Sequence, residues 1–151
     1  MKTEIQKLTS LLKRTFDKGA WHGPSVTDAL QGVNAANAFS RLPNTHSIIE
    51  LVGHMTSWRT YVAKKLAGDD TFNVTDELNF PVATDWGKTL KALEESQRQL
   101  LAAIEKFPEE KLSALVEGVS DKYTYYTIIN GIIHHDTYRT GQIMLITKAT
   151  G

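Results

Sequence analysis

Four long segments of the chain repeat apolar residues at spacings of three and four, which is the period of one face of an α-helix. These segments run over residues 3–18, 45–67, 85–106 and 127–148. Amphipathic helices of this length become stable when their apolar faces pack against one another. The sequence therefore predicts an all-α fold, an up-down four-helix bundle that forms a single domain over residues 1–151.

Residues that start and stop helices agree with these boundaries. Ser47 with Glu50 has the spacing of a capping box at the start of the second long helix. Ser25 with Asp28 has a similar spacing, which predicts a short extra helix in the first connection. Residues that commonly end helices follow three of the four segments, namely Gly19, Gly68 and Pro108.

The composition narrows the classes of function. Lys and Arg total 17, as do Asp and Glu, so the net charge is zero and the basic excess typical of nucleic-acid-binding proteins is missing. There is no cysteine, which rules out disulfides and thiolate zinc sites. The sequence shows neither an apolar leader nor a run of about 18 apolar residues. We expect a cytoplasmic protein that binds neither nucleic acid nor membrane, and weak charge repulsion favours its self-association.

Two histidines and an arginine are expected inside the bundle. His54 lies three or four residues from apolar positions of the second long helix, and His135, Arg139 and Gln142 lie on the apolar stripe of the fourth. A buried histidine is commonly a core residue whose hydrogen bonds are satisfied. Imidazoles from facing helices also assemble metal sites in bundles, so the pair supports either interpretation.

Four stretches resemble the DinB-like family, also called the DinB/YfiT-like metalloenzymes: WHGPSVTDAL, HSIIELVGHMTSW, the DW pair at 85–86 and IINGIIHHDTYRTGQI. The resemblance implies a four-helix bundle, often a homodimer, in which three histidines hold a divalent metal such as zinc or nickel. Family members with a known activity are thiol S-transferases or metal-dependent hydrolases. The ligand positions correspond to His54, His135 and Arg139, so an arginine stands where the third histidine is expected.

Arg139 changes what such a site can do, because a guanidinium has only donors and no lone pair for a cation. Three interpretations remain open. In the first, His54 and His135 hold a metal with other ligands. In the second, Arg139 and the two histidines bind a small carboxylate or phosphate. In the third, Arg139 is structural and pairs with an inward carboxylate, for which Glu50, one turn before His54, is a candidate.

Further side chains are candidates for the lining of the site: His22, His46, Glu50, Trp58, Tyr61 and Gln142. Gly141, inside the fourth helix, predicts the close approach of another helix, with a dimer interface as one location. The sequence assigns no catalytic residue.

The leading hypothesis for function is a metal-dependent enzyme of the thiol S-transferase or hydrolase type, with its metal at His54 and His135. Because the chain lacks cysteine, the thiol would come from a small co-substrate. The alternative is a non-catalytic protein whose metal-free site binds a small anionic ligand or a protein partner.

Overall fold

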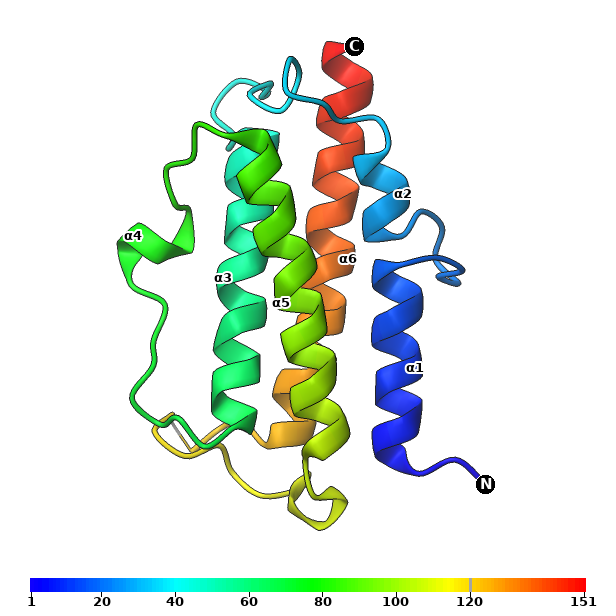
Figure 1. The fold of residues 1–151 in the computed structure, drawn as a ribbon, viewed down its shortest axis with the longest axis vertical. Coiled ribbons are helices and arrows are strands. Elements are labelled where there is room, and N and C mark those ends of the chain that lie inside the picture. The colour runs from blue at the N-terminus through cyan, green and yellow to red at the C-terminus, as the bar shows by residue number, and fades with distance from the viewer. Residues whose placement is uncertain (120) are drawn as a thin grey trace.

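Four long helices form a bundle in the computed structural model, which describes residues 1–119 and 121–151 (Figure 1). The long helices are α1 (Glu4–Phe16), α3 (Ile48–Leu66), α5 (Trp86–Lys106) and α6 (Tyr125–Thr150). Two short helices, α2 (Val26–Leu30) and α4 (Asp76–Asn79), and a 3-10 turn at Glu109–Lys111 lie in the connections. The predicted all-α four-helix bundle is confirmed. Within the described residues, no helix has both the length and the apolar character needed to cross a membrane.

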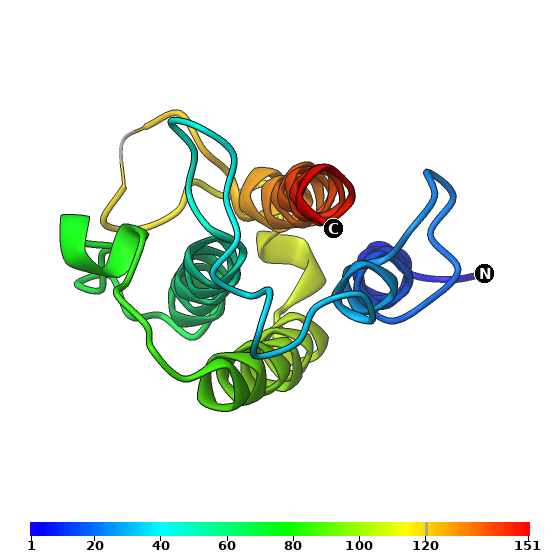
Figure 2. The same ribbon diagram turned by 90° about the horizontal axis from the view of Figure 1, so that it is seen from above.

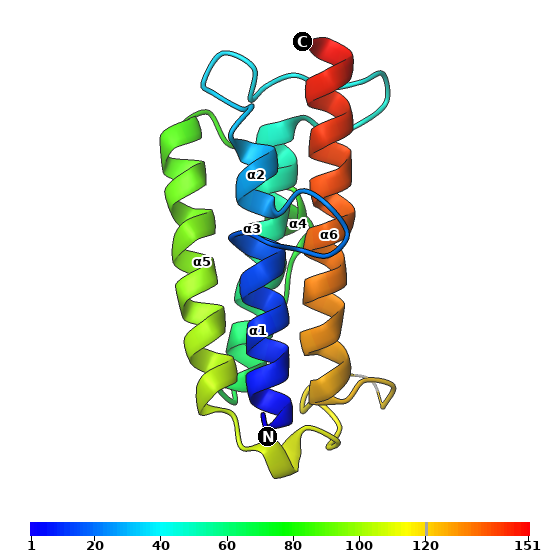
Figure 3. The same cartoon turned by 90° about the vertical axis from the view of Figure 1, so that its right-hand side faces the viewer.

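The long helices do not simply alternate in direction. In Figures 1 and 3, α1 runs up, α3 and α5 run down, and α6 runs up. Because α3 and α5 are parallel neighbours, the connection 67–85 has to cross back along the outside of the bundle, and Figure 2 shows it on the side away from α1. This crossover brings α4 and residues 79–81 alongside α3.

The helix starts follow from side-chain caps. Ser47 accepts a hydrogen bond from the backbone of Glu50, whose side chain accepts one from the backbone of Ser47. Ser25 and Asp28 form the same reciprocal pair at the start of α2. Both predicted capping boxes are confirmed, and they fix the residue at which each chain segment turns into a helix.

A polar layer lies between two clusters of buried apolar residues, one toward the bottom and one toward the top of the bundle in Figure 1. Its centre is Arg59 of α3, which is fully buried. Arg59 forms an ion pair with Asp136 of α6 and donates hydrogen bonds to Gln97 and, at 3.1 Å, to Ser96 of α5. The layer therefore joins three helices at the level of the two inward histidines.

Candidate functional site

The two inward histidines meet between α3 and α6. His54 is 3% exposed, and its Nε2 atom lies 2.9 Å from Nε2 of His135. The two ring centroids are 4.8 Å apart. Both side chains lie on the faces that the helical spacing predicts, because α3 and α6 pack against each other.

The crossover segment holds His54 in one orientation. The backbone carbonyl of Asn79 accepts a hydrogen bond from His54 Nδ1 at 2.6 Å, and its side-chain oxygen accepts one from Trp58 Nε1 at 3.0 Å. A carbonyl oxygen only accepts, so Nδ1 of His54 carries the proton. In the neutral ring, Nε2 then has a free lone pair, which faces His135.

Phe80 lies between two imidazole rings. It stacks on His46 with centroids 3.5 Å apart and on His54 with centroids 4.1 Å apart, and both ring pairs are nearly parallel. His46 thus reaches the site, as predicted, through a phenylalanine that the sequence analysis did not identify. Asn79 ends the short helix α4 and Phe80 follows it, in a connection where periodicity carries no signal, so their role follows only from the path of the crossover.

Arg139 lies one turn after His135 and closes the cluster on the other side. Its Nε atom is 3.5 Å from His135 Nε2, and its Nη1 atom donates to Gln142 Oε1 at 2.9 Å. The guanidinium carbon lies 5.7 Å from the centre of the Phe80 ring. Within the described part of the chain, no carboxylate lies at ion-pair distance from this guanidinium. Arg139 is therefore a half-buried charge without a counter-charge.

Glu50 does not pair with Arg139, so that structural interpretation is wrong. The Glu50 carboxylate accepts hydrogen bonds from the backbone N and the hydroxyl of Ser47 at 2.6 and 3.0 Å. It also lies 3.4 Å from Arg41 Nη2 and 3.7 Å from His46 Nδ1. The bonds from Ser47 lower the pKa of Glu50, with Arg41 adding to the effect. The carboxylate turns toward the helix start because the unpaired N–H groups there attract it.

Burial favours the neutral form of both histidines. It lowers the pKa of His135 to about 4, and the nearby His54 and Arg139 add to the effect because a second positive charge is unfavourable there. Burial also lowers the pKa of His54. The pKa of Arg139 is lowered by burial too, yet a guanidinium remains protonated at neutral pH. The charge of this three-residue cluster at neutral pH is thus the charge of Arg139.

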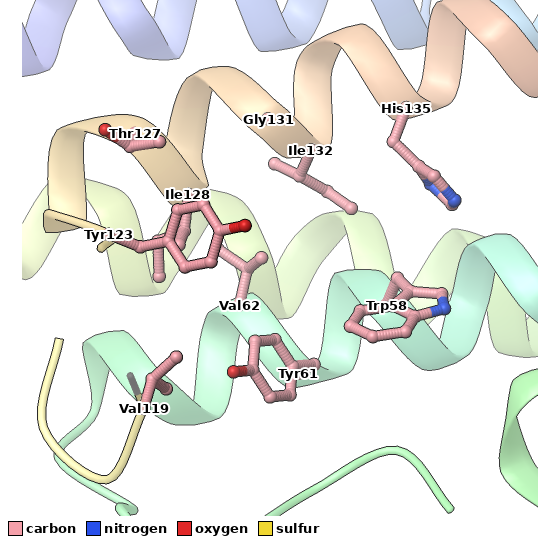
Figure 4. Close-up of a pocket in the computed structure, with 10 residues that line it drawn as sticks. All are labelled: Trp58, Tyr61, Val62, Val119, Tyr123, Thr127, Ile128, Gly131, Ile132 and His135. Atoms are coloured by element: carbon pink, nitrogen blue, oxygen red, sulfur yellow. The ribbon is translucent and has the colours of Figure 1, made fainter. Parts of the chain in front are cut away.

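Two pockets follow one another along α6. The first, of about 450 Å³, is mostly apolar and runs beside residues 127–135, with His135 at one end (Figure 4). The second, of about 290 Å³, is more polar and runs beside residues 139–146. We call them the apolar pocket and the polar pocket. The structure places five predicted candidates in their linings: Trp58 and Tyr61 in the apolar pocket, and His46, Arg139 and Gln142 in the polar one.

The predicted positions of His22 and Glu50 in the site are wrong, and the close approach predicted at Gly141 is not made within the described part of the chain. His22 is exposed on the α1–α2 connection, where its Nε2 lies 3.2 Å from the carbonyl of Pro24, and Figure 2 shows this connection on the side away from α4. Glu50 and His22 belong to neither pocket lining. A Cβ atom at Gly141 would meet no atom within 4 Å, so no helix of the same chain approaches it. Its proposed contact with a second chain stays a prediction.

A sequence model of the DinB superfamily matches residues 9–143, which is most of the chain. The chain belongs to the DinB superfamily. The match includes all of α3, which carries His54, and the part of α6 that carries His135. No curated protein and no solved structure matched the chain.

The three-histidine metal centre implied by the DinB resemblance does not fit the residues of this chain. The described residues contain no group of three His, Cys, Asp or Glu side chains that could hold a metal ion. His54 and His135 converge, but the third position presents the donors of Arg139 toward His135. A guanidinium offers no lone pair and adds a positive charge beside the two nitrogens.

Proposed function

We propose that this DinB superfamily protein binds a small anion, a carboxylate or a phosphate group, in the polar pocket and without a metal ion. The observation that carries the proposal is Arg139, a half-buried guanidinium with no carboxylate partner among the described residues. A guanidinium binds carboxylate and phosphate oxygens through two parallel hydrogen bonds. Partial burial strengthens such bonds, because little water competes for the donors.

The lining of the polar pocket supports an anion of modest size. Asn44, Thr45, His46 and Gln142 add polar groups to Arg139, while leucine and isoleucine side chains form the remaining wall. The volume of about 290 Å³ lies at the lower end of the range for small-molecule pockets, which is roughly 300–1,000 Å³. The pocket therefore suits a small molecule that carries a single acidic group.

Calorimetric titration of metal-free protein with inorganic phosphate and with benzoate tests this proposal. We expect the Arg139→Gln variant to bind about tenfold or more weakly, because a charge-assisted hydrogen bond contributes roughly 1.5–3 kcal/mol. Arg98→Gln is the matched control, since Arg98 is an exposed arginine of α5 that pairs with Glu95. Binding by neither anion, or equal binding by the Arg139 and Arg98 variants, would refute the anion site.

A second candidate, a metal-dependent transferase or hydrolase, is favoured by the geometry of the histidine pair. The Nε2 atoms of His54 and His135 converge to 2.9 Å, somewhat closer than the roughly 3.0–3.4 Å between two nitrogen ligands that lie about 2.1 Å from one ion. The bond from His54 Nδ1 to the Asn79 carbonyl is of the kind that orients metal-binding histidines. In this candidate, His54 and His135 would hold a zinc or nickel ion, which would supply Lewis-acid activation of a small thiol or of water.

Elemental analysis of untagged protein, purified without chelators and after incubation with divalent ions, separates the two candidates. We expect little metal in the wild type and about one ion per chain in Arg139→His, because the new imidazole supplies the third ligand. The triple variant Arg139→His/His54→Ala/His135→Ala should lose the metal again. If the wild type already holds a stoichiometric ion, the metal-free proposal fails and the metal-dependent candidate gains support.

A further inference from the structure

The apolar pocket is an elongated trough between α3 and α6. Trp58 and His135 lie at one end, and Val119 and Tyr123 of the α5–α6 connection lie at the other (Figure 4). Along α6 the trough runs from Thr127 to His135, a length of about 12 Å. This limited length suits a small molecule better than a bound helix or strand. The volume of about 450 Å³ is typical of such sites.

The residues that line the apolar pocket provide no partner for a charged group on a ligand. Apart from His135, the side chains around the trough are aromatic, aliphatic or hydroxyl-bearing, and none is a carboxylate, a lysine or an arginine. An ion placed here would lose its hydration without gaining a counter-charge.

Aromatic walls indicate the chemistry of the group that fits. Trp58 and Tyr61 come from successive turns of α3 and are only partly buried, and Tyr123 is 45% exposed at the far end. Partly exposed aromatic side chains that surround an open volume can gain contacts from a flat apolar ring system, through offset-stacked or edge-to-face arrangements.

Gly131 forms part of the trough wall and keeps it open. Inside a helix, glycine is the least favourable residue after proline. A Cβ atom at Gly131 would meet no atom within 4 Å, so the packing of the fold does not require a glycine here. Gly141, about three turns further along α6, is equally free of neighbours but lines neither pocket, so it provides a matched comparison.

From this geometry we propose that the apolar pocket binds an uncharged aromatic ring system of a small molecule, between the Trp58 and Tyr61 side of α3 and the Gly131 side of α6. The apolar and polar pockets share no lining residue. The inference therefore goes beyond anion binding at Arg139 and does not depend on it.

Titration with N-phenyl-1-naphthylamine, an uncharged aromatic probe whose fluorescence rises in apolar surroundings, tests this site. The wild type should show saturable binding. Gly131→Leu should weaken binding about tenfold or more, because the leucine side chain occupies the trough. Gly141→Leu should bind as the wild type does, and so should Arg139→Gln, which separates this site from the anion site. The inference would be overturned if the wild type showed no saturable binding, or if the two leucine variants bound the probe equally well.

Energy transfer from tryptophan to the probe gives a readout that does not depend on the leucine variants. Trp58 lines the trough, whereas Trp21 is fully exposed on the α1–α2 connection. We expect Trp58→Phe to remove most of the transfer and Trp21→Phe to remove little. If Gly131→Leu instead changes the sedimentation of the protein and leaves probe binding intact, the trough is occupied by a second chain and the small-molecule site is refuted.

Discussion

Arginine and histidine at position 139 differ in the property on which metal binding depends. A neutral imidazole offers a lone pair, whereas the guanidinium of Arg139 offers five donors and a permanent charge. The surrounding cluster, with His54 and His135 at 2.9 Å, is compatible with either an ion or a shared proton. The side chain at 139 therefore decides whether the site attracts cations or anions, which is why exchange of this residue is the most informative substitution.

The histidine pair predicts a loss of stability in mild acid. The pKa of His135 is about 4 in the folded protein against 6.5 for a free side chain, so the unfolded state binds more protons between these values. The free energy of unfolding should therefore fall as the pH drops from about 6.5 toward 4. Above about pH 6.5, the stabilisation that comes from neutral His135 should be fully present. Urea midpoints measured between pH 7 and about 5 give the slope.

His135→Gln is the control for this pH dependence, because glutamine keeps a polar side chain but does not titrate. The variant should lose less stability than the wild type over the same pH range. An equal loss in both proteins would mean that His135 is already protonated in the native state or that other groups dominate the acid response.

At the scale of elements, the crossover between α3 and α5 completes the site. It supplies the Asn79 carbonyl that orients His54 and the Phe80 ring that stacks on it. Close approach of this segment depends on Gly53, because a Cβ atom there would lie only 2.8 Å from Cγ of Pro81. A glycine in the middle of α3 is therefore explained by the segment that packs on it.

Gly53→Ala should destabilise the protein by about 1–3 kcal/mol, the usual cost of overpacking, although alanine favours a helix. The rigid proline ring has to move, and the Asn79–His54 hydrogen bond should weaken with it. Urea denaturation measures the first effect, and hydrogen exchange at residues 75–85 measures the second.

Gly141→Ala is the comparison for this substitution, because a Cβ atom at that position of α6 meets nothing within 4 Å. It should stabilise the protein by up to ~1 kcal/mol through helix propensity alone. If both alanine variants stabilise the protein, the crossover does not press on α3 as the distances indicate.

For the whole molecule, the polar layer around Arg59 couples three helices. Asp136→Ala would leave a fully buried guanidinium without its carboxylate, and breaking a buried pair in this way costs roughly 3–5 kcal/mol. The double variant Arg59→Met/Asp136→Leu should recover most of this loss, since both charges are then removed. Equilibrium unfolding in urea compares the three proteins. Equal stability of the wild type and Asp136→Ala would contradict the assigned pairing.

The homodimer implied by the DinB resemblance stays a prediction. The net charge of zero removes one barrier to self-association. On α6, the large apolar side chains of Tyr138 and Leu145 are 61% and 60% exposed to solvent. Sedimentation velocity over a range of protein concentrations tests it, and a single monomeric species at every concentration would contradict it.

The sequence by itself determined the four long helices, the capping boxes at Ser25 and Ser47, and the inward positions of His54 and His135. Periodicity and capping are local properties, so they can be read from neighbouring residues. The sequence also contains a local signal for the polar layer. Arg59 lies four residues after buried Met55 and three before buried Val62, so its charge stands on a core-facing stripe.

Only the tertiary structure decided which side chains surround the two histidines. Glu50 was expected at Arg139 because it lies one turn before His54, yet its carboxylate caps α3 instead. Phe80 and Asn79 reach the site from a connection without periodicity, because parallel α3 and α5 force the chain back along the bundle. Helical spacing specifies the face on which a side chain lies. The partner it meets depends on the direction of each helix and the path of each connection, which no single segment encodes.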